Sequence, residues 1–384
     1  MPRRIVLCFD GTWNTPATGS GRLANLFNNF ARMRGGGADA VRRAIEHVDP
    51  NAGIETNVCR LYRSVIRREG GAVPPGEMGQ VKWYDAGVGT NWYDRLPGGV
   101  FGVGLSQNIR DGYKFLSDTY DDGDAVFIFG FSRGAYTARS LVGLIRNSGL
   151  LPKGLAGANA NSPQMMEAYN LYRNRADDPE SQRAKQFRAS RNAPVIKIKF
   201  LGVWDTVGAL GIPVDAFADF NRSEFEFHDT ELSGIVENAF HAVAVDEHRE
   251  PYRVTLWDPK EKPNQSVEQR WFVGAHADVG GGYPSRDLSD IPLKWMQEKA
   301  KECGLVLDPR GIPAIAGANV LGELHDSYRQ FLNGAYAAAH PPYLRPVCRL
   351  AFGNEVVDGS VSSRYHDMDL YRPSNDGFAE ALRR

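Results

Sequence analysis

Short apolar runs alternate with amphipathic segments along most of the chain. The apolar runs are rich in β-branched and aromatic residues, as buried strands are, and they predict strands at about 5–9, 81–85, 125–129, 195–204, 253–257 and 270–274. Apolar residues at helical spacing predict helices at about 57–68, 105–120, 135–145, 232–246 and 291–303. Strands that alternate with helices indicate an α/β fold, with a mostly parallel central sheet and helices on both faces.

One pentapeptide, Gly130-Phe131-Ser132-Arg133-Gly134, lies between a predicted strand and the helix that follows it. A Gly-x-Ser-x-Gly in this position is the pattern of the nucleophile elbow of α/β-hydrolases. The turn is so sharp that a side chain at Gly130 or Gly134 would clash with neighbouring backbone. The pattern predicts that Ser132 is a nucleophile at the carboxyl edge of the sheet, above the amino terminus of a helix.

Two more strand ends carry partners for a serine nucleophile, which needs a base and a carboxylate that orients this base. Asp205 ends the run 195–204 and is the predicted acid, with a helix cap or turn as the alternative role. His276 follows the run 270–274 and precedes a glycine-rich loop, and it is the predicted base. The other seven histidines lie in loop-like segments or in the predicted helix 232–246.

Further residues near these strand ends fit the same site. The backbone N–H groups of Arg133 and of a loop at Gly11 and Thr12 are candidates for an oxyanion hole, where each donor lowers the barrier by roughly 3 kcal/mol. Asp10 and Asp278 are interpreted as carboxylates that support the site without reacting. Asp278 is too close in sequence to the predicted base to reach its Nδ1.

Aromatic and charged residues extend this picture. Trp13, Trp92 and Tyr136 are candidates for lining an acyl or lipid pocket, with core packing as the alternative. The cluster Asp-Glu-His-Arg at 246–249 is predicted to be ion-paired and structural.

Two segments do not follow the alternation of strands and helices. Residues 151–193 are polar and contain helical patterns near 165–173 and 181–191, and they form either a cap over the site or a surface excursion. The segment from about 305 mixes glycine, proline and aromatic residues, so we expect an irregular extension packed on the core. The whole chain, 1–384, is predicted to be a single domain.

Composition narrows the class of function. The 384 residues carry a formal net charge of -1, which argues against a general nucleic-acid binder. The first apolar run is too short for a signal peptide, and no run approaches the roughly 18 apolar residues of a membrane span. We therefore expect a chain that is cytoplasmic as synthesised, with delivery elsewhere by a secretion system left open. The four cysteines form no metal-binding pair, and reduced thiols are expected.

Taken together, these motifs resemble the DUF2235 family, which contains the catalytic domain of Tle1-type phospholipase effectors of bacterial type VI secretion. The resemblance is carried by residues 8–14, 56–58, 86–90, 130–139, 202–208 and 271–283. It implies an α/β-hydrolase fold, a triad of Ser132, Asp205 and His276, and hydrolysis of phospholipid esters. A secretion or immunity partner and contact with a membrane surface are compatible with it.

Three functions are weighed. The favoured one is a serine esterase or lipase that cleaves carboxylic esters, with lipid or phospholipid acyl esters as the expected substrates, through an acyl-enzyme without a cofactor or metal. The second is a metal-dependent phosphoesterase built from Asp10, Asp205, His276 and Asp278. The third is a non-catalytic binding module. The segment 8–12 also resembles haloacid dehalogenase-type phosphatases, but Cys8 stands where their nucleophilic aspartate must be.

Overall fold

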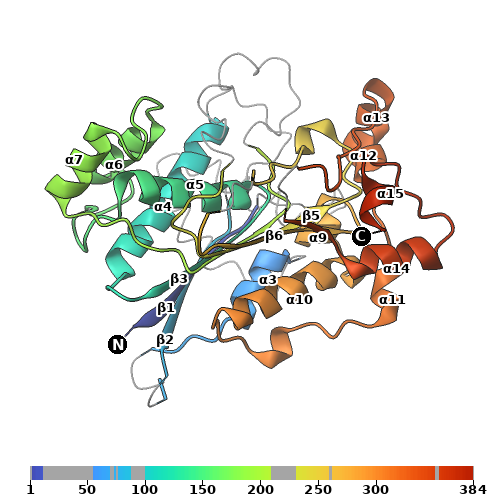
Figure 1. Ribbon diagram of the computed structural model, residues 1–384, viewed down its shortest axis with the longest axis horizontal. Helices are drawn as coiled ribbons and strands as arrows, with labels where there is room; N and C mark the ends of the chain where they lie inside the picture. Colours follow the sequence, from blue (N-terminus) through green and yellow to red (C-terminus); the bar gives the residue numbers. More distant parts are fainter. Residues whose placement is uncertain are drawn as a thin grey trace, which may run out of the picture.

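Seven strands form one sheet in which all neighbouring strands are parallel (Figure 1). The computed structural model describes residues 2–11, 55–69, 73–74, 77–87, 100–208, 231–258, 262–350 and 354–383, and these strands lie within those ranges. The strand order is β2-β1-β3-β4-β5-β6-β7. The strands are β1 (Arg3–Phe9), β2 (Gly79–Asp85), β3 (Ala125–Phe131), β4 (Phe200–Trp204), β5 (Asn238–Ala244), β6 (Ser266–Phe272) and β7 (Glu355–Val357). The predicted α/β fold with a parallel central sheet is confirmed.

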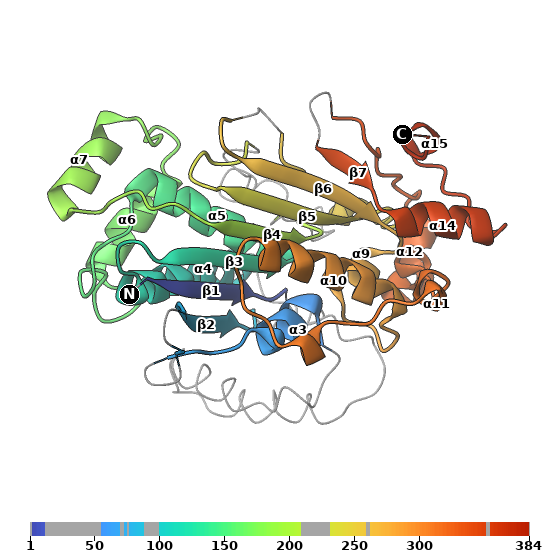
Figure 2. The same ribbon diagram turned by 60° about the horizontal axis from the view of Figure 1, so that its bottom comes forward.

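Helices cover both faces of this sheet (Figure 2). The longer ones are α3 (Asn57–Ser64), α4 (Val100–Thr119), α5 (Arg133–Ser148), α6 (Pro163–Arg173), α7 (Gln182–Arg191), α10 (Asp287–Glu302) and α14 (Gly359–Asp367). The short ones are η3 (Glu250–Tyr252), α9 (His276–Gly280), η4 (Pro309–Gly311), α11 (Gly317–Val320), α12 (Ser327–Gln330), η5 (Phe331–Gly334), α13 (Ala335–Ala339) and α15 (Phe378–Ala381). Among the described residues, no helix combines the length and the apolar character needed to cross a bilayer.

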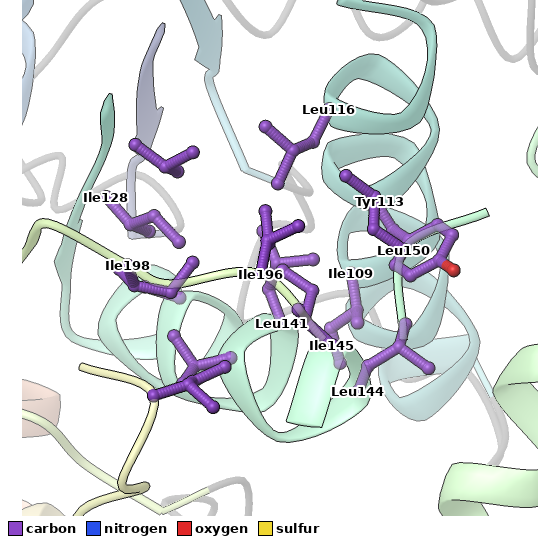
Figure 3. Close-up of a cluster of buried hydrophobic side chains, with 14 of the residues drawn as sticks. Ile109, Tyr113, Leu116, Ile128, Leu141, Leu144, Ile145, Leu150, Ile196 and Ile198 are labelled. Atoms are coloured by element: carbon purple, nitrogen blue, oxygen red, sulfur yellow. The ribbon is translucent and has the colours of Figure 1, made fainter. Parts of the chain in front are cut away.

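Alternate residues of the central strands face opposite layers, because successive side chains of a strand point to opposite faces. On β1, Ile5 and Leu7 lie in a buried cluster with residues of α4 and α5. Val6 and Cys8 lie in a second cluster with residues of α3 and α10. Figure 3 shows part of the first cluster, with Ile128 of β3 on one side and Tyr113 and Leu116 of α4 on the other. The sheet is therefore buried on both faces.

Two of the predicted elements are wrong. The segment 232–246, predicted as a helix, contains strand β5, whose residues are buried at nearly every position. A continuously buried run is compatible with a helix or a strand, and here its hydrogen bonds to β4 and β6 make it a strand. The segment 253–257, predicted as a strand, is not one, because the backbone N–H and C=O of Trp257 bond to the side-chain amide of Gln269 instead of a strand. The predicted strand at 195–204 is a regular strand only from Phe200.

The two segments outside the alternation are ordered. Segment 151–193 contains α6 and α7, which lie beside α5 (Figure 1). The segment beyond 305 adds β7 to the edge of the sheet next to β6, and it forms a third buried cluster with β5 and β6 that includes Val347, Val361 and Phe378. The sequence showed no periodic pattern for β7, which has only three residues. The last part of the chain therefore packs against the strands that lead into the candidate site.

Candidate active site

Three neighbouring regions of the sheet end at the same edge, where ligands bind in parallel α/β folds. Ser132 directly follows β3, Asp205 directly follows β4, and His276 begins α9 after β6. Strands β3 and β4 are adjacent, with Phe131 opposite Trp204 in the register. The three residues predicted from separate motifs are therefore brought to one edge of the sheet.

Ser132 occupies a sharp turn between β3 and α5. Its backbone angles, φ 57 and ψ -120, are strained for a residue other than glycine. Its N–H donates to the carbonyl of Trp204 at 3.0 Å, which fixes the turn to the next strand. A Cβ at Gly130 would lie 2.4 Å from the carbonyl oxygen of Gly134, and a Cβ at Gly134 would lie 2.1 Å from the carbonyl oxygen of Phe9. The two glycines are thus required by close backbone contacts.

Asp205 and His276 form a buried hydrogen-bonded pair. The distance from His276 Nδ1 to Asp205 Oδ2 is 2.6 Å, and both side chains are buried. Burial lowers the pKa of His276 although the Asp205 carboxylate acts in the opposite direction, so the imidazole is neutral near pH 7. With Nδ1 donating to the carboxylate, Nε2 of a neutral imidazole is an acceptor.

The Nε2 atom of His276 is buried and has no hydrogen-bond partner among the described residues. The rings of Phe131 and Tyr252 flank the imidazole, with ring centroids at 4.6 Å and 5.0 Å. Phe131 directly precedes Ser132, so the imidazole lies beside the elbow. Ser132 does not hydrogen-bond to Nε2 here, and such bonds often tighten only when substrate is present.

Arg345 completes this group and was missed by the sequence reasoning. Its Nη1 donates to Oδ1 of Asp205 at 2.6 Å, and its Nη2 donates to Oδ2 at 3.0 Å. Burial alone would raise the pKa of Asp205, but the Arg345 cation and the hydrogen bond from His276 hold it well below its ordinary value. Asp205 is thus an ionised carboxylate with partners on both oxygens. No local pattern marks Arg345, which is 140 positions from its partner.

The backbone N–H groups predicted to form the oxyanion hole differ in whether they already have an acceptor. The N–H of Arg133, at the start of α5, has no acceptor among the described residues, as the prediction requires. The N–H of Gly11 instead donates to Oδ1 of its neighbour Asp10 at 2.7 Å, so it is not free in this structure. Thr12 lies outside the described residues. A Cβ at Gly11 would come within 3.1 Å of the Cβ of Ser132, which places this loop against the elbow.

Asp10 is buried behind the same loop. Its Oδ2 accepts hydrogen bonds from the hydroxyls of Thr56 at 2.5 Å and Tyr84 at 2.6 Å. Burial raises the pKa of Asp10 to about 6, although these hydrogen bonds act in the opposite direction. The carboxylate therefore ties the loop at Gly11 to α3 and to β2.

The other candidate carboxylates have partners of their own. Asp278 Oδ2 accepts from the N–H of Ala275 at 3.0 Å, and Oδ1 lies 2.6 Å from Nδ1 of His325. Glu247 forms a buried ion pair with Arg249 at 2.7 Å. The cluster 246–249 stands at the end of strand β5 rather than at the end of a helix.

The other predicted site residues are aromatic residues and possible metal ligands. Tyr136 is buried in α5, whereas Trp13 and Trp92 lie outside the described residues. Asp10 and Asp278, two residues of the alternative phosphoesterase site, bond to different partners, Thr56 and His325. Within the described part of the chain, no group of three or more His, Cys, Asp or Glu side chains is arranged to hold a metal ion.

Comparison with known proteins identifies a family that this chain matches. Residues 3–299 match the model of the catalytic domain of Tle1-like phospholipase effectors of the type VI secretion system. The uncharacterized protein YEL023C of Saccharomyces cerevisiae is 28% identical over 222 residues, which are 53% of this chain and 30% of the yeast protein. This chain thus spans less than a third of the length of that relative.

Two solved structures align with 88% of this chain. One is an uncharacterized protein from Pseudomonas aeruginosa, with 18% identity, a TM-score of 0.42 and 51% of its chain covered. The other is the Tle1 effector bound to the VgrG spike of the type VI secretion system, with 16% identity, a TM-score of 0.45 and 78% of its chain covered. The family match extends over most of the chain and confirms the resemblance predicted from the motifs. The chain belongs to the family of Tle1-like phospholipase effectors of the type VI secretion system, through their catalytic domain.

Proposed function

We propose that this chain is a serine hydrolase that cleaves acyl esters of phospholipids through Ser132, His276 and Asp205. The observation that carries the proposal is the buried 2.6 Å bond between His276 and Asp205, at the sheet edge where Ser132 occupies its strained turn. A neutral imidazole with its second nitrogen unpartnered is suited to accept the proton of a serine hydroxyl.

In the proposed reaction, Ser132 Oγ attacks the ester carbonyl while its proton passes to Nε2 of His276. The electron pair of the carbonyl moves onto its oxygen, which the free N–H of Arg133 stabilises at the start of α5. When this pair returns, the bond to the alcohol breaks, and His276 gives its proton to that alcohol. Water then attacks the acyl-enzyme by the same steps and releases the fatty acid.

Two observations support a phospholipid over a neutral ester. The family is that of phospholipase effectors. In addition, the Arg133 side chain is partly buried directly after the nucleophile and forms no hydrogen bond or ion pair with other described residues. A cation in such a setting suits the phosphate of a lipid headgroup. From the same membership we propose delivery by a type VI secretion system, with a component of that machinery as partner.

The test is a panel of acyl esters that runs from short soluble esters to phospholipid vesicles. Wild type and Ser132→Ala are compared on each substrate, and circular dichroism checks that the variant is folded. We expect release of fatty acid from vesicles by the wild type, with at least about a thousandfold less in the variant. Full activity of Ser132→Ala would refute the serine mechanism. Activity confined to short esters would refute the phospholipid substrate and leave the mechanism standing.

A further inference from the structure

Arg345 belongs to the segment beyond residue 305 and lies outside the part of the chain that matches the family's catalytic domain, 3–299. Its side chain is nevertheless fully buried against Asp205. The arginine therefore brings a buried positive charge to the base-orienting carboxylate from a separate stretch of sequence.

The position of Arg345 is fixed by several contacts besides the ion pair. Its Nη1 donates to the carbonyl of Ala244 at 2.8 Å, and its Nη2 donates to the carbonyl of Tyr252 at 2.6 Å. Its own carbonyl accepts from Nδ2 of Asn375 at 3.0 Å, and the same Nδ2 donates to the carbonyl of Val245. The guanidinium is thus held in one orientation against the end of β5.

Within the described residues, the Asp205 carboxylate accepts four hydrogen bonds, two at each oxygen. Oδ1 accepts from the N–H of Ala244 at 2.9 Å and from Arg345, and Oδ2 accepts from His276 and from Arg345. Without the guanidinium, the buried pair of Asp205 and His276 would lose a cationic partner. The pair would then bind a proton more readily, on the carboxylate or on the imidazole. The bidentate contact also restricts rotation of the carboxylate, which a single contact would not.

We propose that Arg345 is a positioning residue of this site, which keeps Asp205 ionised and oriented so that His276 is neutral before each turnover and can pass the serine proton on to the leaving alcohol. This inference rests on the proposed serine mechanism and assigns a role in it to the C-terminal segment. During turnover the proton moves from Ser132 to His276 and on to the leaving alcohol, while Asp205 and Arg345 keep their opposite charges throughout.

Other charged groups also face His276. The backbone N–H of His276 donates to Oε2 of Glu247 at 3.2 Å, and Glu247 forms an ion pair with Arg249. Asp278 on the same helix is paired with His325. The ring of Tyr252 on η3 packs against the imidazole from another element. Arg345 also acts to lower the pKa of Glu247, but burial and the ion pair with Arg249 act on this group more strongly. A substitution at residue 345 therefore changes the charge around Asp205 first, because the guanidinium bonds to both of its oxygens.

The experiment compares three variants with the wild type. Arg345→Met removes the charge, and Arg345→Lys keeps the charge but cannot form the bidentate contact. Arg364→Met is the matched control, because Arg364 is also a buried arginine of the C-terminal segment, but its Nη1 donates to the carbonyls of Val320 and Gly322. Circular dichroism and urea unfolding monitor the fold of all three.

Two readouts are followed against pH. One is the proton NMR signal of the hydrogen bond between His276 and Asp205, which requires no substrate. The other is kcat/KM on a soluble ester. In the wild type we expect both to have a midpoint below about pH 6.5, the ordinary histidine value.

The expected results separate charge from orientation. Arg345→Met should raise both midpoints by about one pH unit or more. Arg345→Lys should keep the midpoints close to the wild type while kcat falls about tenfold or more. Arg364→Met should lower stability without moving either midpoint.

Unchanged midpoints in folded Arg345→Met, or an equal change in Arg364→Met, would overturn the inference. If Arg345→Met does not fold, Arg345→Lys decides: wild-type kcat in this variant would refute the positioning role. Failure of the serine mechanism appears elsewhere, as activity in Ser132→Ala, while the NMR midpoint still reports on Arg345.

Discussion

The hydroxyl of Tyr84, on the second strand of the chain, donates a 2.6 Å hydrogen bond to the carboxylate of Asp10 at the end of the first. β1 and β2 are neighbours in the sheet, so this bond joins their ends beside the loop that contacts the elbow. Burial raises the pKa of that carboxyl group to about 6 even though it accepts three hydrogen bonds. The stability of the protein should therefore depend on the protonation of this one group.

We expect Asp10→Asn to remove a pH dependence of stability between about pH 4 and pH 6. The pKa of Asp10 is higher in the folded state, about 6, than the value near 3.8 for the unfolded chain, so its contribution is full below pH 4 and is lost as pH rises through 6. The loss is on the order of 3 kcal/mol. Urea unfolding of wild type and variant at pH 4 and pH 7 measures the difference, with Asp369→Asn as an exposed control. A difference that is the same at both pH values would contradict the assignment.

Gly134→Ala should destabilise the protein and inactivate it. A methyl group at this position would lie 2.1 Å from the carbonyl oxygen of Phe9, a contact that requires β1 and the elbow to separate. We expect a loss of roughly 1–3 kcal/mol in the free energy of unfolding, measured with urea. Gly359→Ala is the control, since a Cβ there meets no atom within 4 Å. Equal stability of the two variants would show that the close approach of β1 to the elbow is not maintained in solution.

Arg133→Met should separate phospholipids from neutral esters. If the guanidinium binds a lipid phosphate, its loss removes a charged hydrogen bond of roughly 1.5–3 kcal/mol, which corresponds to a decrease of about tenfold or more in kcat/KM on phospholipid. Soluble neutral esters should change by less than about threefold, because the backbone N–H that serves the oxyanion is kept. Arg146→Met, in the same helix but paired with exposed Glu180, serves as the control. Equal decreases on both substrates would rule out a role in phosphate binding.

The sequence was most informative where the candidate site is formed by a few consecutive residues at the end of a strand. Ser132, Asp205 and His276 were predicted because each follows an apolar run, and parallel strands bring their carboxyl ends together. Arg345 and its hydrogen bonds could not be predicted, because its partner is 140 positions away and its segment has no periodic pattern. The same limit applies to His325, which pairs with Asp278 across 47 positions.

The misassigned strand β5 shows a second limit. Its residues are buried at nearly every position, and the apolar ones do not follow a strict alternation, so the pattern does not separate a strand from a helix. As a consequence, His241 was placed on a helix, whereas it lies on β5, and its Nε2 accepts from the N–H of Thr206 at 3.1 Å. Only the hydrogen bonds to β4 and β6 distinguish the two structures, and these come from distant segments.

The ion pair between Asp205 and Arg345 has a consequence for biosynthesis. The ribosome makes residue 205 long before residue 345, and Asn375, which holds the backbone of Arg345, is made later still. A nascent chain therefore carries its elbow and its imidazole for some time without the guanidinium. The contact joins residues 140 positions apart, and contacts of such long range are associated with slow folding. The candidate site can thus be complete only after translation has passed the C-terminal segment.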